Sequence, residues 1–358
     1  MGDISVLSIH DRVACFHSLY PFLRNERPGR FDYFDSAEDC LKRDRNRTLV
    51  MVRSFIKPDR VDLPLMRKLR EKYERIAFFH DDAGGGIPRL EVLPFVDLFY
   101  SKALFRDRSL YGRSLYGKEL YSDFFHDRYG VTDPEPRQRA VETRPEMLAK
   151  LRLSWNIGVG DYPRGKLRQR VGVAASMAFS FKVTPLFYGR GRLPADPVSR
   201  NPGTIPVHAR LAPAPRPSIA YQRKLVMERI EGNPLFLTGS VSQNRYNSEL
   251  TRSRIVLSPF GWGELCLRDF EAVLSGALLL KPDMSHLETW PDVFSPGETY
   301  APFSWEAGDL VETAKRYLDD EAERSRIVRN AYESYRRQLA DLPSRFERTI
   351  EEIEARRG

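Results

Sequence analysis

Residues 258–284 constrain the fold of this chain more than any other segment. They begin in a short apolar run, pass through a turn that contains Gly261 and Gly263, continue with helical periodicity, and end in the apolar run ALLLKPD. Continuous apolar runs of this length are typical of strands that are buried on both faces, as in parallel sheets. The order therefore predicts a strand, a turn, a helix and a second strand, which is one half of a nucleotide-binding α/β unit.

The polar residues of the predicted helix recur at steps of four, three and four. This spacing places them on one stripe of the helix: Glu264, Arg268, Glu271 and Ser275. The residues of the opposite arc are expected to pack on the sheet: Cys266, Phe270, Val273 and Leu274. The helix is therefore predicted to turn one polar face away from the sheet. An ordinary solvated face with an ion pair between Glu264 and Arg268 is the alternative.

The start of this helix is a predicted phosphate site. A helix N-terminus has unpaired backbone N–H groups and the positive end of the helix dipole. Gly261 and Gly263 have no side chains that would block the approach of a phosphate. Arg268, one turn into the helix, is expected to bind a second phosphate oxygen, and Glu271 is expected to accept hydrogen bonds from sugar hydroxyls.

The segment resembles the donor-binding half of GT-B glycosyltransferases, in particular the spore-maturation-like, exostosin-like and group 1 families. Their helix also reads R-x-x-E-A, followed by a small residue and glycine. The matching residues of this chain are Arg268, Glu271, Ala272, Ser275 and Gly276. The resemblance implies that Glu271 holds hydroxyls of a nucleotide-sugar donor and that the turn before the helix holds its diphosphate. The retaining families place a second glutamate where this chain has Gly263, and we include the neighbouring Glu264 among the donor-binding residues.

A dinucleotide fingerprint is the competing interpretation of the same turn. Gly261, Gly263 and Cys266 follow a predicted strand, and Asp283 ends the next strand. This order imitates the pattern in which glycines and a later acidic residue hold NAD. That fingerprint usually opens its domain, whereas this turn follows several predicted strand–helix pairs. An NAD-dependent oxidoreductase is therefore the second hypothesis, and a non-catalytic binding protein is the third.

Strand-like and helix-like segments alternate along the first half of the chain. The predicted strands are residues 3–9, 31–35, 48–55, 75–82 and 96–102, and the predicted helices include 37–44 and 62–73. This alternation predicts a parallel sheet with helices on both faces. The second half repeats the scheme from a strand at residues 183–189. The predicted fold class is therefore α/β, GT-B-like, with two Rossmann-type domains that face a central cleft.

The resemblance gives each part of the chain a role. Residues 1–175 are expected to bind the acceptor, residues 176–338 to bind the nucleotide sugar, and residues 339–358 to form a helix that crosses back to the first domain. Arg190 follows the first predicted strand of the second domain, where many GT-B enzymes place an arginine on the donor diphosphate. A solvated loop arginine is the alternative.

A histidine and two carboxylates leave the fourth predicted strand together. His80, Asp81 and Asp82 precede the glycines at 84–86. Open α/β sheets bind ligands at the carboxyl ends of their strands. An inverting transferase needs a base for the acceptor hydroxyl, so His80 and Asp82 are the predicted catalytic residues. An Asx-type turn with an ordinary histidine is the alternative. No metal site is expected, because adjacent strand residues point to opposite faces.

Residues 108–121 repeat the tetrapeptide SLYG and bring in Tyr111, Tyr116 and Tyr121. Tyrosines interleaved with basic residues would suit sugar stacking or an anionic glycolipid surface. We favour the other interpretation, in which they anchor a helix and a loop. The phosphate-loop spelling that ends at Lys118 is rejected, because Glu119 stands where such a loop needs serine or threonine.

Length and composition bound the remaining possibilities. The chain has 358 residues, 41% of them hydrophobic, which is enough for two domains with a substantial core. Its three cysteines lack a pairing or zinc-binding spacing, and neither a run of eighteen apolar residues nor a secretory signal is present. The net charge of +8 is compatible with phosphorylated substrates, an anionic membrane or nucleic acid. Nucleic acid is the weakest of these, because no nucleic-acid-binding signature occurs.

The chain is thus predicted to move a sugar from a UDP- or GDP-linked donor to an acceptor hydroxyl, with no metal or other cofactor. The expected acceptor is a glycan, a glycolipid or a cell-surface polysaccharide, and nucleic acid is not an expected partner. The expected location is the cytoplasm. Its net positive charge is compatible with peripheral contact at the inner face of the membrane.

Overall fold

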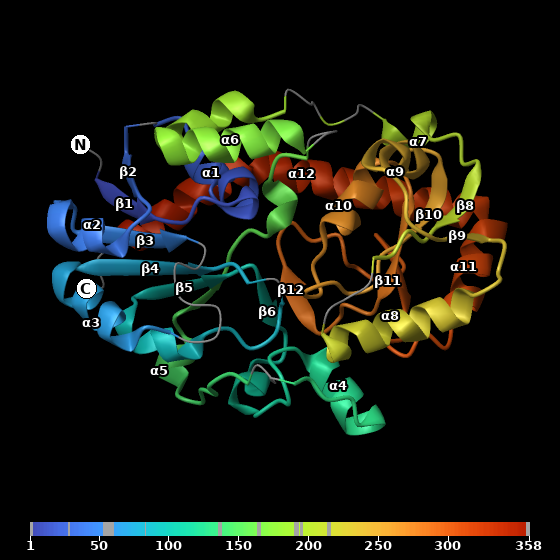
Figure 1. Cartoon of the computed structure of the whole chain (residues 1–358), viewed down its shortest axis with the longest axis horizontal. Coiled ribbons are helices and arrows are strands. Elements are labelled where there is room, and N and C mark those ends of the chain that lie inside the picture. Colours follow the sequence, from blue (N-terminus) through green and yellow to red (C-terminus); the bar gives the residue numbers. More distant parts are fainter. Residues whose placement is uncertain are drawn as a thin grey trace.

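The computed structural model describes residues 3–27, 29–52, 61–82, 84–134, 138–162, 166–189, 193, 196–212 and 216–355. They form two α/β units that lie side by side in Figure 1, each built on a parallel sheet. A small antiparallel pair lies between the two sheets and joins β6 (Ala103–Phe105) to β12 (Leu287–Thr289). The predicted α/β class with two units is confirmed.

The first sheet contains the five strands that periodicity predicts in the first half of the chain. Its order is β2-β1-β3-β4-β5-β7, and all of its pairs are parallel. The strands are β1 (Ile4–Leu7), β2 (Phe31–Phe34), β3 (Thr48–Val52), β4 (Arg75–His80), β5 (Leu98–Ser101) and β7 (Leu151–Leu153). The edge strand β7 is an addition to the predicted set.

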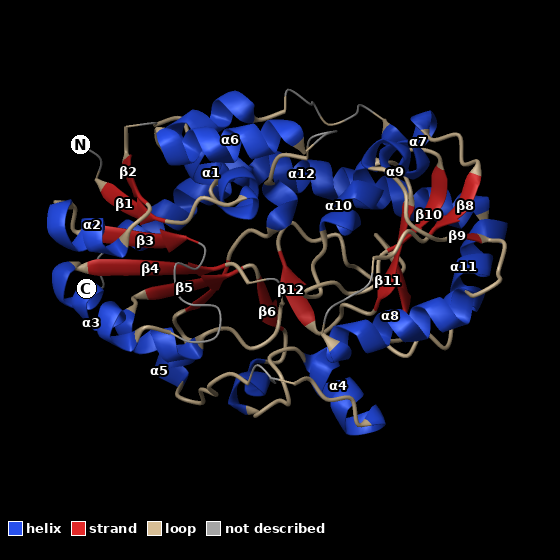
Figure 2. Cartoon of the chain, in the orientation of Figure 1, coloured by secondary structure: helices blue, strands red, loops and turns tan. Residues whose placement is uncertain are grey.

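Both faces of the first sheet are covered, as its apolar strands require. In β3, Leu49 and Met51 face one hydrophobic cluster, whereas Val50 and Val52 face another. The alternation follows from the period of two along a strand. The surrounding helical segments are η1 (Ala14–Ser18), α1 (Tyr20–Leu23), α2 (Ala37–Arg43), α3 (Leu63–Lys72), η2 (Leu90–Phe95), α6 (Leu167–Ala178) and η5 (Phe181–Phe187). Figure 2 shows helices around both sheets.

The second sheet has the order β13-β11-β10-β8-β9, again with parallel pairs throughout. Its strands are β8 (Ile205–His208), β9 (Phe236–Leu237), β10 (Ser253–Leu257), β11 (Leu278–Pro282) and β13 (Ala301–Phe303). The helices around it are α7 (Pro197–Arg200), α8 (Pro217–Ile230), α9 (Gln243–Leu250), α10 (Leu267–Leu274) and α11 (Leu310–Asp319). Four further helical segments lie between the first unit's strand β6 and its helix α6: η3 (Arg108–Gly112), α4 (Leu120–Tyr129), α5 (Pro145–Leu148) and η4 (Ile157–Val159).

The strand predicted at residues 183–189 is wrong. The segment forms the 3-10 helix η5, whose first turn is closed by the Ser180 side chain accepting a hydrogen bond from the Lys182 amide. Pro185 has no N–H for a sheet ladder, which disfavours a central strand there. The second sheet instead begins with β8, which the sequence analysis did not predict. The predicted boundary at residue 175 falls inside α6, and Phe181 and Tyr188 pack in a cluster of the first unit.

The last helix, α12 (Glu321–Glu354), spans both units. Ile327 packs in the core of the second unit, whereas Phe346 and Ile350 pack in a cluster of the first. Figure 1 shows α12 crossing from one unit to the other. The helix continues through Pro343, and the break between α11 and α12 lies at Asp320. Among the described residues, no helix is both long and apolar enough to cross a membrane.

Candidate active site between the two sheets

One hydrogen bond joins the two predicted parts of the site. The Gly85 amide, in the loop after β4, donates to Glu264 Oε2, in the turn before α10, over 2.6 Å. Both segments follow the carboxyl ends of parallel strands, where α/β sheets bind ligands. The loop needs its glycines, because a Cβ on Gly86 would lie 1.8 Å from the Lys118 carbonyl oxygen. The tertiary structure therefore brings together residues that are nearly two hundred positions apart.

His80 and Asp82 lie at the end of β4 in a charged environment. His80 Nε2 is 3.5 Å from Asp82 Oδ2 and has no hydrogen-bond partner among the described residues. Asp82 Oδ2 also lies 3.3 Å from Lys118 Nζ and 3.2 Å from Arg139. Burial lowers the pKa of His80, and this outweighs the opposite effect of Asp82, so the imidazole is neutral near pH 7.

Burial by itself would raise the pKa of Asp82. The carboxylate faces His80 and the two cations Lys118 and Arg139, which hold its pKa well below the ordinary value. Asp82 is therefore ionised, while the neutral ring beside it has a free nitrogen. This arrangement suits proton acceptance by His80 with an ionised carboxylate next to it.

A small pocket lies beside His80. It is lined in part by His80, Asp81, Trp155 and Asn156. Asn156 Nδ2 donates to the Pro291 carbonyl of the second unit over 2.9 Å, and Trp155 Nε1 donates to the Ser18 carbonyl over 3.0 Å. The glycine-rich loop at residues 154–160 thus forms one wall of this pocket and contacts the second unit.

The prediction that Glu264 lies on the polar stripe of α10 is wrong. The helix begins at Leu267, and Cys266 is its N-cap in a capping box with Asp269. Glu264 therefore precedes the helix and does not belong to the stripe that includes Arg268 and Glu271. It is fully buried, and its Oε1 lies 3.8 Å from His286 Nε2. Burial would raise the pKa of Glu264, but His286 and the Gly85 amide lower it below the ordinary value.

The glycine turn closes on itself in this structure. The Gly261 amide donates to the Gly263 carbonyl over 2.9 Å, so this amide is engaged within the turn and not free for a phosphate. A Cβ on Gly261 would lie 3.0 Å from Cys266 Sγ, which makes the position tight. Trp262, between the two glycines, is 56% exposed and projects a large ring from the turn. Its position between two glycines was the signal that sequence reasoning overlooked.

Two residues of the predicted polar stripe, Arg268 and Glu271, lie on the same face of α10. Tyr246 of α9 donates from its hydroxyl to Glu271 Oε2 over 2.9 Å, and Arg268 Nε donates to the same hydroxyl over 3.3 Å. Phe270, one residue away, is fully buried, as the predicted packing arc requires. The structure therefore places Arg268 and Glu271 together, with Tyr246 as an additional member that the sequence pattern did not indicate.

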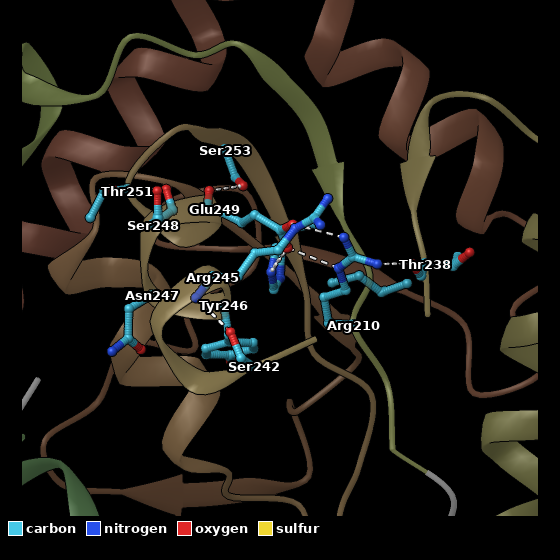
Figure 3. Close-up of polar contacts among 12 residues, drawn as sticks. Arg210, Thr238, Ser242, Arg245, Tyr246, Asn247, Ser248, Glu249, Thr251 and Ser253 are labelled. Atoms are coloured by element: carbon cyan, nitrogen blue, oxygen red, sulfur yellow. Dashed lines mark hydrogen bonds and ion pairs between the residues drawn. The ribbon is translucent and has the colours of Figure 1, made fainter. Parts of the chain in front are cut away.

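A second polar group lies at the end of β8. Figure 3 shows Arg210 and Arg245 converging on Glu249 of α9, and the Arg210 guanidinium holds both carboxylate oxygens at 2.8 and 2.7 Å. Burial lowers the pKa of His208, at the end of β8, to about 4, since the nearby Arg210 and Arg268 add to the effect of desolvation. Sequence reasoning missed this group, because its members come from separate elements.

Two arginines near the turn have no carboxylate partner. Arg223 of α8 donates from Nε to the Phe260 carbonyl over 3.3 Å, and Arg268 donates to the Arg210 carbonyl over 2.6 Å. Within the part of the chain that the structure describes, neither arginine takes part in an ion pair. Partly buried guanidinium groups without counter-charges favour an anionic ligand.

Under the turn, a buried ion pair supports α10. Asp269 Oδ1 lies 3.0 Å from Lys281 Nζ, and both side chains are fully buried. The same carboxylate accepts from the Ser258 hydroxyl over 2.6 Å and from the Cys266 amide over 2.9 Å. Lys281 ends the apolar run of β11, so a lysine inside an otherwise apolar strand was the available signal for this pair.

Arg190 lies outside the described residues. Its neighbour Gly189 is described, and the Gly189 amide donates to Asp161 Oδ1 over 2.8 Å.

The tyrosines of the SLYG repeat are buried or half-buried. Tyr111 and Tyr121 are fully buried. The favoured interpretation as structural anchors agrees with this burial.

One known protein family matches part of the chain. Residues 216–343 match the family described as Glycosyl transferase-like. The match includes the turn from Gly261 to Cys266 and assigns it to a glycosyltransferase-like domain, which leaves the oxidoreductase hypothesis without support. No curated protein sequence matches the chain.

Solved structures similar to the chain span nearly its whole length. Anabaena HepE in complex with UDP has 10% sequence identity and a TM-score of 0.43, with 98% of this chain and 100% of that chain covered. An alpha-glucosyltransferase in complex with UDP has 10% identity and a TM-score of 0.47, with 98% and 99% covered. The T4 phage BGT in complex with UDP-glucose has 12% identity and a TM-score of 0.41, with 98% of each chain covered.

The family match and the architecture agree with the resemblance of the segment from Arg268 to Gly276. The matched region holds four of the five strands of the second parallel sheet, Arg268 and Glu271, and most of α12. It faces a first parallel α/β unit to which α12 returns. Residues 216–343 are therefore similar to a glycosyltransferase-like domain, within a chain whose described residues form two parallel α/β units.

Proposed function

We propose that the chain transfers a sugar from a nucleoside diphosphate donor to an acceptor hydroxyl. The observation that carries this proposal is the pair Arg223 and Arg268, two partly buried arginines without carboxylate partners beside the turn at residues 261–266. A diphosphate supplies the missing negative charge, and guanidinium groups bind phosphate oxygens through charge-assisted hydrogen bonds. UDP- and GDP-linked sugars are the donors that fit this chemistry.

The remaining donor contacts follow from the same region. Glu271 already accepts a hydrogen bond from the Tyr246 hydroxyl, so its carboxylate is oriented for hydroxyls of the ribose or the sugar. The exposed Trp262 ring offers an apolar face for stacking. The Gly261 amide donates to the Gly263 carbonyl, so the turn would have to open before this amide could bind a phosphate.

In the proposed transfer step, the base that accepts the proton is His80 of the first unit. The acceptor oxygen forms a bond with the anomeric carbon, and the bond from that carbon to the diphosphate oxygen breaks with its electron pair on the diphosphate. The acceptor proton passes to His80 Nε2, which has no hydrogen-bond partner among the described residues and belongs to a neutral ring. Asp82 stabilises the imidazolium that results, while Lys118 and Arg139 keep this carboxylate ionised.

We propose transfer without a metal ion, because the phosphate ligands are arginines. No group of three or more His, Cys, Asp or Glu that could hold a metal occurs among the described residues. Activity in excess EDTA should equal activity in magnesium. Loss of transfer in EDTA and its return with manganese would overturn this part of the proposal.

The proposed acceptor is a glycan, a glycolipid or a cell-surface polysaccharide, and nucleic acid is not a proposed partner. The small pocket beside His80, with Trp155 in its wall, supports an acceptor hydroxyl at this place. We place the protein in the cytoplasm, at the inner face of the membrane where such acceptors are assembled. The net charge of +8 supports that location, since this leaflet is anionic.

Nucleotide binding tests the proposal directly. UDP, GDP and NAD are titrated separately while the melting temperature is followed, and a ligand at a hundred times its Kd adds about 2.7 kcal/mol of stability. Arg223→Gln should weaken UDP or GDP binding roughly ten- to a hundredfold. Arg229→Gln, an exposed arginine on the same helix, is the matched control and should bind as the wild type does. Stabilisation by NAD alone, by none of the ligands, or equally in the wild type and Arg223→Gln would overturn it.

A further inference from the structure

Helix α6 has its polar and apolar faces reversed. Its buried side chains include Gln169 and Ser176, with exposed fractions of 0% and 1%. Its exposed side chains include Leu167 at 74%, Val171 at 49% and Met177 at 66%. Surface helices normally bury the apolar face and expose the polar one. Here three large apolar side chains of the helix face solvent, alongside Arg168 and Arg170.

The reversal follows from what the inner face contacts. Gln169 Nε2 donates to the Asp161 carbonyl over 3.0 Å, and the Ser176 hydroxyl lies 2.9 Å from His10 Nδ1. Gly172 lies between them, and a Cβ there would be 2.7 Å from the Phe16 ring. Polar and small residues are therefore needed on the inside. No packing requirement of the first unit accounts for the apolar residues on the outside.

The apolar surface continues beyond the helix. Phe179 is 81% exposed and Leu186, in η5, is 73% exposed. We call the following residues the apolar face: Leu167, Val171, Met177, Phe179 and Leu186. Half of the exposed large hydrophobic side chains in the described residues belong to this single segment. Such clustering marks an interaction site, whereas apolar residues scattered singly over a surface do not.

The charges around the apolar face have one sign. Four exposed basic residues accompany it: Lys166, Arg168, Arg170 and Lys182. No aspartate or glutamate occurs between Asp161 and Asp196. In the described residues none of the four cations takes part in an ion pair, and the Arg168 guanidinium donates to the Leu186 carbonyl over 3.0 Å. Exposed apolar side chains and exposed cations therefore occur together along this segment.

The position of α6 leaves this face accessible. In Figure 1 the helix lies on the outer side of the first unit, and not between the two sheets. The loop that follows His80 and the turn that holds Gly261 meet elsewhere, between the units. A large partner on the apolar face would therefore not cover the proposed active site.

We propose that the apolar face binds an anionic lipid bilayer. Apolar side chains of an interfacial helix enter the boundary between headgroups and acyl chains, while lysine and arginine remain at the headgroups and bind anionic lipid. A second copy of the chain is a poor occupant, because a two-fold interface would oppose like charges around its centre. The role of this face does not depend on the proposed transfer reaction, so either proposal can fail alone.

Vesicle sedimentation of the full chain tests the surface. Without any nucleotide, the protein should sediment with vesicles of phosphatidylglycerol and phosphatidylcholine, and much less with pure phosphatidylcholine. The double variant Leu167→Ser with Phe179→Ser should bind at least roughly tenfold more weakly. Lys166→Gln with Arg170→Gln should lose about fivefold for each cation, and high salt should have a similar effect.

The matched control removes exposed apolar residues elsewhere. Leu63 and Met227 are 42% and 38% exposed, and Leu63→Ser with Met227→Ser should bind as the wild type does. All variants alter exposed side chains and should keep the wild-type melting temperature. Failure to bind the anionic vesicles, or equal loss in the control, would overturn the proposal. So would a dimer in sedimentation equilibrium that Leu167→Ser with Phe179→Ser converts to a monomer, because the face would then belong to a second copy.

Discussion

The Glu264 carboxylate accepts a 2.6 Å hydrogen bond from the Gly85 amide and so links the turn before α10 to the loop after β4. Both groups are buried, and Glu264 is fully so. A hydrogen bond to an ionised and buried acceptor is among the stronger ones in a protein. This contact therefore helps to hold the two sides of the proposed active site in register.

Glu264→Ala should lower the free energy of unfolding by about 1–3 kcal/mol, because it leaves the buried Gly85 amide without an acceptor. Glu264→Gln keeps an oxygen for that amide and should lose less. Urea denaturation of the three proteins measures the difference. Equal stability of Glu264→Ala and the wild type would show that this contact does not hold the two segments together.

Gly86→Ala should destabilise the loop after β4 strongly. The added Cβ would lie 1.8 Å from the Lys118 carbonyl oxygen, which is backbone and cannot move aside cheaply. Gly29→Ala is the control, since a Cβ there meets nothing within 4 Å. Thermal unfolding should show a large loss for the first variant and almost none for the second. Similar melting temperatures for both would contradict the described packing of the loop.

Phe270→Ala and Glu271→Ala separate scaffold from site. Phe270 is fully buried, and its removal should cost about 3–5 kcal/mol of stability. Glu271→Ala should leave stability near that of the wild type and weaken nucleotide-sugar binding roughly ten- to a hundredfold. Calorimetric titration and denaturant unfolding measure the two effects. Unchanged donor affinity in Glu271→Ala would remove this residue from the donor site.

Asp269→Ala should be more destabilising than Lys281→Met. Removal of the carboxylate leaves a fully buried ammonium near a single carbonyl acceptor, and breaking such a pair costs about 3–5 kcal/mol. Removal of the lysine leaves Asp269 with the Ser258 hydroxyl and the Cys266 amide. Denaturant unfolding of both variants gives the order. The reverse order would mean that the two hydrogen bonds do not stabilise the lone carboxylate.

His208 should make the fold less stable in acid. Burial, with a further contribution from Arg268, lowers its folded pKa from 6.5 to about 4. Between these values the unfolded chain binds more protons, so the contribution is complete above pH 6.5 and is lost as the pH falls toward 4. The full loss is about 3 kcal/mol. His208→Gln should make the pH dependence of the unfolding free energy shallower in this window, and an unchanged slope would contradict the assignment.

Sequence periodicity predicted the elements that are defined by a local pattern of apolar residues. The strands of the first sheet and the helices α2 and α3 were found near their predicted bounds, because apolar alternation and apolar runs report burial directly. The placement of Arg268 and Glu271 on one helical stripe was also predictable, since it depends only on the period of the helix. The strand expected at residues 183–189 is absent because Pro185 has no N–H for a sheet ladder, although the surrounding residues are apolar.

The candidate site shows where such local information ends. His80 and Asp82 were predicted from their position at the end of a strand. Their neighbours Lys118 and Arg139 come from other segments, and no sequence motif indicates that these segments lie close to Asp82. The same holds for Arg210 and Glu249, which belong to different elements. Arg223 also reaches the turn from another helix. Contacts between distant segments are set by packing, and one sequence contains no direct record of them.

The amino-acid sequence alone thus determined the α/β class, the strand–turn–helix–strand order of residues 253–282 and the placement of Arg268 and Glu271 on one face of a helix, because these follow from local periodicity. Only the tertiary structure decided that Glu264 turns toward Gly85, that Asp269 pairs with Lys281 inside the core, and that α6 exposes its apolar side. The physical reason is the same in each case. The orientation of a side chain depends on which distant surface is packed against its element, and periodicity identifies the faces of an element without identifying their partners.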